Sequence, residues 1–139
     1  NPLYHGEISA LFNFFGSKKL NPKDYYFISS HEPCSLCLSA ITWSGFDNFY
    51  YFFPYADTKS TFNIPHDLNI LKEVFHINEG EYKKNNKYWK SFSIIEEIKK
   101  FEDPNNSFFK EKIDKIKLLY AELSTEYQKT KISNDIPLK

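Results

Sequence analysis

The feature that most constrains this chain is a set of three metal-ligand side chains in two distant segments. The imidazole of His5 lies near the beginning of the sequence, and the thiols of Cys34 and Cys37 form a later CxxC pair. A carboxylate, Glu7, follows the histidine by two positions, and Pro33 precedes the first cysteine. Imidazole nitrogens and thiolate sulfurs are preferred ligands of Zn²⁺ in proteins. The pattern therefore predicts a fold that brings His5 to the CxxC pair, with a zinc ion held between them.

Three protein ligands are typical of a catalytic zinc, because the fourth position stays open for water. Glu7 is placed to take a proton from that water as a general base and to return it as a general acid. Alternatives stay open at this point. The cysteines could form a redox pair, or His31 could complete a four-ligand structural site. Without the cysteines, Glu7 would be explained by the dipole of a helix.

The charge pattern bears on substrate and location. The 18 basic residues are all lysine and balance 18 acidic residues. Arginine is the usual bidentate partner of phosphate and guanine, and nucleic-acid-binding domains usually carry a basic surplus. A nucleic-acid substrate is therefore disfavoured, although a local lysine patch would still permit one. A CxxC pair is no disulfide framework, and no membrane span or signal peptide is recognisable. We expect a cytoplasmic protein without membrane contact.

Apolar periodicity divides the first part of the chain into alternating helices and strands. Helices are predicted over residues 3–16 and 34–44, with His5 and Glu7 in the first turn of the former. Short aromatic and β-branched runs predict buried strands over residues 25–30 and 49–53. This alternation predicts an α/β fold with a parallel sheet.

The second part of the chain is less regular. The expected elements are a loop at 55–65, a helix at 67–75, a loop or turn at 79–87, and either strand or helix at 88–101. Apolar residues then recur at helical spacing over residues 107–130, a stripe that favours packing over a partner groove. The length is that of one domain. We predict a catalytic core at 1–103 and a C-terminal helical extension at 104–139.

The segments around His5 and the CxxC pair resemble the cytidine and deoxycytidylate deaminase superfamily, whose zinc enzymes carry the signature H-x-E followed by P-C-x-x-C. The resemblance makes the predicted core at 1–103 a deaminase catalytic core. The likeness is carried by residues 1–8, 32–37, 40–41 and 43–45 and spans roughly residues 1–60. It implies a three-layer α/β/α cytidine-deaminase-like fold and a catalytic Zn²⁺. By position, the zinc ligands would be His5, Cys34 and Cys37, and Glu7 would be the proton shuttle. The family also places a helix and a hairpin before the histidine, and we expect both to be missing from this chain.

The branch of the superfamily is less sharply defined. Residues 5–9 are similar to fungal cytosine deaminases, whereas Glu32 and Trp43 are similar to residues of guanine deaminases and tRNA adenosine deaminases. The resemblance implies a hydrolytic deaminase of a free nucleobase, nucleoside or nucleotide, of guanine or cytosine type, acting as a homodimer. A tRNA adenosine deaminase is the alternative enzyme. From another class, the alternative is a non-catalytic zinc-containing subunit that acts by protein interaction.

Overall fold

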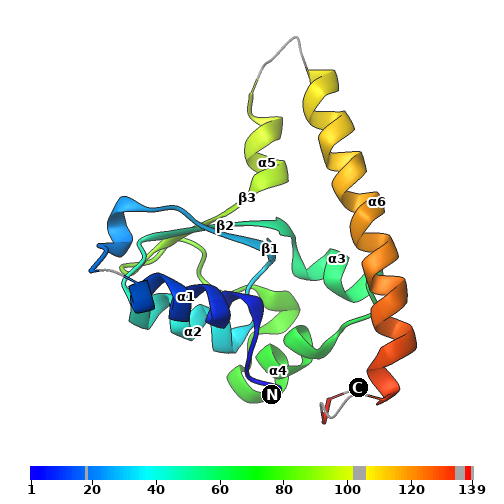
Figure 1. Cartoon of the computed structure of the whole chain (residues 1–139), viewed down its shortest axis with the longest axis horizontal. Helices are drawn as coiled ribbons and strands as arrows, with labels where there is room; N and C mark the ends of the chain where they lie inside the picture. Colours follow the sequence, from blue (N-terminus) through cyan, green and yellow to red (C-terminus); the bar gives the residue numbers. More distant parts are fainter. Residues whose placement is uncertain (18, 102–105, 134–136, 139) are drawn as a thin grey trace.

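The computed structural model describes residues 1–17, 19–101, 106–133 and 137–138. Within these ranges the chain forms a mixed α/β fold around a three-stranded parallel sheet (Figure 1). The strands are β1 (Phe27–His31), β2 (Asn48–Phe53) and β3 (Lys90–Ser93), and β2 lies in the centre. The predicted α/β class and parallel sheet are confirmed, and the arrangement is consistent with a cytidine-deaminase-like fold.

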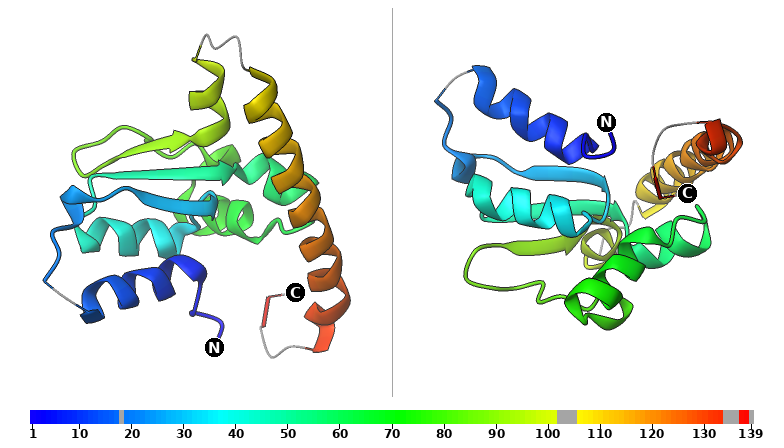
Figure 2. Two further views of the ribbon diagram at one scale, coloured as in Figure 1. Left: turned by 45° about the horizontal axis from the view of Figure 1, so that its top comes forward. Right: turned by 90° about the horizontal axis from the view of Figure 1, so that it is seen from below.

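Six α-helices lie in the described residues. They are α1 (Gly6–Ser17), α2 (Ser35–Ser44), α3 (Tyr55–Ser60), α4 (His66–Phe75), α5 (Ile94–Lys99) and α6 (Asn106–Thr130). Helices α1 and α2 lie side by side on one face of the sheet (Figure 2). No helix of the described residues has the length and apolar character needed to cross a membrane.

The main core lies between the sheet and the pair α1–α2. Phe27 of β1 is in register with Phe49 of β2, and both rings are buried. They meet Leu11 of α1 and Ile41 of α2. Side chains alternate between the two faces of a strand, so every second residue of β1 points away from this core. Ile28 is accordingly 68% exposed. The predicted buried strand is therefore buried on one face only in β1, because α1 and α2 cover only that face.

Two further elements differ from the sequence prediction. The stretch expected to be a loop at 55–65 contains α3, which begins after Pro54; the Pro54 carbonyl accepts the N–H groups of Asp57 and Thr58. The ambiguous stretch at 88–101 contains both alternatives, since β3 passes directly into α5. The Ser93 hydroxyl caps that helix by accepting the N–H of Glu96.

The C-terminal helix α6 crosses the carboxyl end of the central strand (Figure 1). Ile113 and Tyr120 pack against a second aromatic cluster, formed by Phe52, Phe53 and Phe62. Leu119 and Leu123 stay about half exposed, so only part of the predicted apolar stripe packs on the core. The boundary predicted between residues 103 and 104 lies outside the described residues, and the division of the chain at that point stays a prediction.

Candidate metal centre

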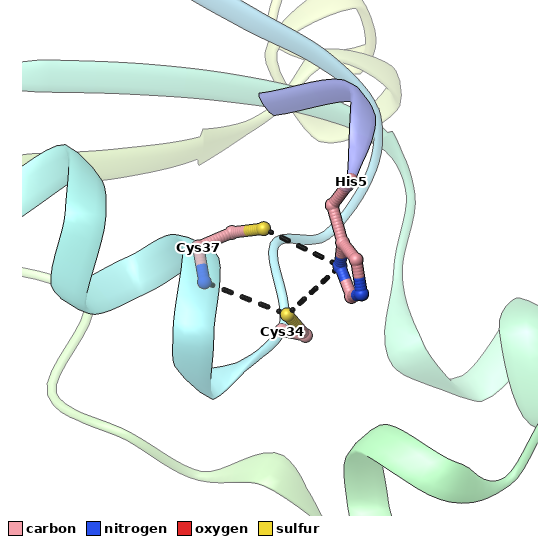
Figure 3. A group of neighbouring side chains, drawn as sticks. All are labelled: His5, Cys34 and Cys37. Carbon is pink, nitrogen blue, oxygen red and sulfur yellow. Dashed lines mark hydrogen bonds between the residues drawn. The ribbon is translucent and has the colours of Figure 1, made fainter. Parts of the chain in front are cut away.

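Two helix N-termini carry the three predicted ligand residues to one place. His5 immediately precedes α1, and its carbonyl accepts the N–H of Ser9, 2.9 Å away. Cys34 is the N-cap of α2, and its sulfur accepts the N–H of Cys37 at 3.5 Å. Because Cys37 lies in the first turn of the same helix, both sulfurs lie on one side of that terminus. Figure 3 shows the His5 imidazole facing the two sulfurs.

The distances fit a zinc ion. The His5 Nδ1 lies 3.4 Å from the Cys34 sulfur and 3.6 Å from the Cys37 sulfur. Nitrogen and sulfur ligands of one tetrahedral zinc lie about 3.5 Å apart, given bonds of about 2.0 and 2.3 Å. All three ligand atoms lie within 4.8 Å of one another. The group can therefore hold a metal ion, and its donor set is one that zinc prefers.

The two thiols shift each other's pKa in opposite directions. The hydrogen bond from the Cys37 thiol lowers the pKa of Cys34 to about 7, against the opposing effect of burial. The same hydrogen bond, together with burial, raises the pKa of Cys37. One sulfur of the pair is therefore readily available as a thiolate, the form that binds metals.

Glu7 lies beside this cluster, in the first turn of α1. The Ser29 hydroxyl donates a hydrogen bond of 2.8 Å to its Oε1, and the Cys37 sulfur lies 3.4 Å from its Oε2. The side chain is thus held by β1 on one side and faces the metal-ligand group on the other. A helix-dipole role alone would not require a partner on the strand.

Glu32 anchors the segment that leads into the CxxC pair. Only 3% of the residue is exposed, and its carboxylate accepts the N–H of Tyr55 at 3.0 Å and the hydroxyl of Tyr82 at 2.8 Å. The Lys84 ammonium lies 2.9 Å from Oε1. The Tyr55 hydroxyl in turn donates to the carbonyl of Pro33. These contacts fix the backbone on which Cys34 sits.

A cavity of about 410 Å³ opens next to the cluster. Its lining includes Glu7, His31, Ile64 and Asp67. A second cavity of about 520 Å³ shares His5, Cys34, Ile64 and Asp67 with it, so the two adjoin at the metal-ligand group. Burial raises the pKa of Asp67, while the nearby His5 acts in the opposite direction. Among the described residues, no lysine side chain lines either cavity.

Sequence reasoning missed three residues of this site. Ser29 and Asp67 were not singled out, and His31 was considered only as a fourth metal ligand. The metal-ligand group found in the described residues does not include His31, which lines the cavity instead. A usable signal was the alternation in β1, which places Phe27, Ser29 and His31 on the core-facing side of the strand.

Comparison with known proteins agrees with this geometry. Residues 1–53 match the family model described as the cytidine and deoxycytidylate deaminase zinc-binding region. The matched segment includes the three residues of the metal-ligand group, and Glu7 as well. The comparisons with curated proteins and with solved structures found no match. Residues 1–53 are therefore similar to the zinc-binding region of the cytidine and deoxycytidylate deaminase family.

Proposed function

We propose that this protein is a zinc-dependent hydrolytic deaminase of a free nucleobase, nucleoside or nucleotide, with guanine or cytosine as the favoured type. The observation that carries the proposal is the position of Glu7. Its carboxylate is hydrogen-bonded to Ser29 and lies next to the His5, Cys34 and Cys37 side chains. A purely structural zinc would have no use for a carboxylate held in that place.

The reaction adds water to the amidine-type carbon of a base and replaces its amino group by oxygen, so that ammonia leaves. A zinc ion held by His5, Cys34 and Cys37 would supply the acidity that turns water into a nucleophile near neutral pH. Glu7 performs the proton transfers. Its carboxylate accepts one proton from the attacking water and passes it to a ring nitrogen. It then accepts the second proton, from the hydroxyl group now on the ring carbon, and passes it to the leaving amino group. Ser29 keeps the carboxylate oriented toward the cavity during these steps.

The charges around the cavity favour an uncharged base over a nucleotide. Glu7 and Asp67 contribute carboxylates to the lining, and no lysine of the described residues does so. A phosphate placed there would be repelled and would lose its hydration without a cationic partner. The Asp67 carboxylate has no hydrogen-bond partner within the described part of the chain, so it can accept an N–H group of a bound base.

The test is ammonia release by the zinc-loaded protein. The panel contains guanine, cytosine, adenine, cytidine, deoxycytidylate and an adenosine-bearing tRNA loop. We expect release from a free base, and a loss of about 100-fold or more in kcat for Glu7→Gln with zinc still bound. Glu73→Gln is the matched control, because Glu73 is exposed on α4 and the substitution removes the same charge as Glu7→Gln. Its activity should equal that of the parent.

Three results would overturn parts of the proposal. Release from the tRNA loop alone would favour the tRNA deaminase alternative. Release from deoxycytidylate alone would show that the charge argument is wrong. No release from any compound, with one zinc bound per chain, would favour the non-catalytic subunit.

A further inference from the structure

The ring of His31 is enclosed by aromatic side chains at the end of β1. Its centroid lies 5.0 Å from that of Phe53, 5.2 Å from Phe62 and 5.4 Å from Tyr120. Phe53 comes from β2, whereas Tyr120 comes from α6 and lies outside the segment that matches the family model. At these distances all three rings pack against the imidazole.

His31 also belongs to the lining of the cavity beside the metal-ligand group, together with Glu7. Its Nδ1 lies 3.2 Å from the hydroxyl oxygen of Ser30, while Nε2 has no hydrogen-bond partner within the described residues. A ring held by packing, with one nitrogen engaged and the other unpaired, is suited to bind a polar group of a ligand.

We propose that His31 binds the substrate through Nε2 and that Tyr120 is the positioning residue that holds the ring in place. This inference rests on the proposed deaminase function. In the neutral tautomer whose Nδ1 accepts from the Ser30 hydroxyl, the proton is on Nε2, which then donates to an acceptor. The ligand group it selects is a ring carbonyl oxygen, which guanine and cytosine possess and adenine lacks.

Helix α6 is fixed well enough for this role. The Gln128 side chain donates a hydrogen bond of 2.9 Å to the carbonyl of Phe62, one of the rings around His31. Tyr127 lines the second cavity, which shares His5 and Asp67 with the first. The C-terminal helix is therefore a component of the substrate site and not a separate attachment.

The experiment compares His31→Leu, Tyr120→Ala and Tyr120→Phe with the parent, all loaded with zinc. Leucine keeps the apolar volume at residue 31 but removes the ring nitrogens, and phenylalanine keeps the ring at residue 120. Phe108→Ala is the control, since its side chain is 56% exposed on the same helix and is no part of the His31 cluster. The measured quantities are KM, kcat and the equilibrium Kd for guanine and cytosine.

We expect KM and Kd to rise about tenfold in His31→Leu, which corresponds to the loss of one hydrogen bond. Tyr120→Ala should raise both in the same direction, whereas Tyr120→Phe and Phe108→Ala should match the parent. In all four variants kcat should change less than threefold, because Glu7, the proton shuttle, is intact.

Unchanged KM and Kd in His31→Leu, with an active parent, would overturn the inference and leave the deaminase function standing. A Tyr120→Ala protein with a lower melting temperature but parental KM would show that Tyr120 is structural only. A parent that binds a base without deaminating it would overturn the proposed function, and the Kd values would still decide the role of His31. A parent that binds neither base would overturn both.

Discussion

Glu32→Gln is the most informative change to the scaffold of the site. The parent carboxylate is buried and accepts hydrogen bonds from the Tyr55 N–H and the Tyr82 hydroxyl, with the Lys84 ammonium 2.9 Å away. Glutamine has nearly the same shape but no charge. Both carboxylate oxygens of Glu32 accept from donors, so the NH₂ group of glutamine would face a donor in place of an acceptor. The substitution therefore weakens charge-assisted hydrogen bonds without opening a cavity.

The expected loss follows from these contacts. Hydrogen bonds to a buried charge contribute about 1.5–3 kcal/mol. The Lys84 side chain is 45% exposed, so its ion pair adds no more than about 1 kcal/mol. We predict that Glu32→Gln lowers the free energy of unfolding by about 2–4 kcal/mol. Because Glu32 precedes the turn that carries Cys34, we also expect zinc affinity to fall about tenfold or more.

Urea denaturation of the zinc-loaded proteins measures the first effect, and competition with a chelator measures the second. The midpoint should move to lower urea with an unchanged slope, as for a change in stability alone. Glu96→Gln is the control, because the Glu96–Lys99 ion pair is exposed on both sides and should contribute little. A loss for Glu32→Gln no larger than that control, with unaltered zinc affinity, would refute the anchoring role.

Four further predictions follow from the same contacts. Cys34→Ala should abolish stoichiometric zinc binding and lower stability, and full zinc content by atomic absorption would contradict the ligand set. Ser29→Ala should lower kcat about tenfold through a misoriented Glu7 with KM nearly constant, so an unchanged kcat would exclude that role. Burial lowers the pKa of His31 below 6.5 in the folded chain. As pH falls below 6.5, His31 is protonated in the unfolded chain before it is protonated in the folded chain, so the parent protein loses stability. Urea titrations at several pH values should show a smaller loss of stability for His31→Leu. The homodimer expected from the family resemblance should use the uncharged outer side of α1–α2, where Trp43 is 91% exposed. Trp43→Glu should then sediment as a monomer. A parent protein that sediments as a monomer would exclude the dimer.

The sequence predicts the metal-ligand group well because its chemistry resides in residue identity. One imidazole and two thiols have few other uses in combination, and Pro33 and Gly45 mark both ends of α2 as predicted. The start of α1 was placed a few residues early, since His5 lies just before the helix and contributes only its carbonyl to it.

Other parts of the structure could not be predicted because they depend on distant contacts. Thr and Ser residues in 55–65 are typical of loops, yet Pro54 and the packing of Tyr55 start a helix there. The contact between His31 and Tyr120 joins residues that no local pattern connects. The same holds for Asp67, whose place in the cavity depends on how α4 lies against the metal-ligand group.

The central claim is that the His5, Cys34 and Cys37 group holds zinc with one position left open beside Glu7. Zinc K-edge X-ray absorption on the zinc-loaded protein tests it most directly. We expect a four-coordinate ion with two sulfur ligands, one imidazole nitrogen and one light ligand from solvent, and the same spectrum in His31→Leu. A spectrum that requires two imidazoles and two sulfurs, or a third sulfur, would contradict it and indicate a closed structural site.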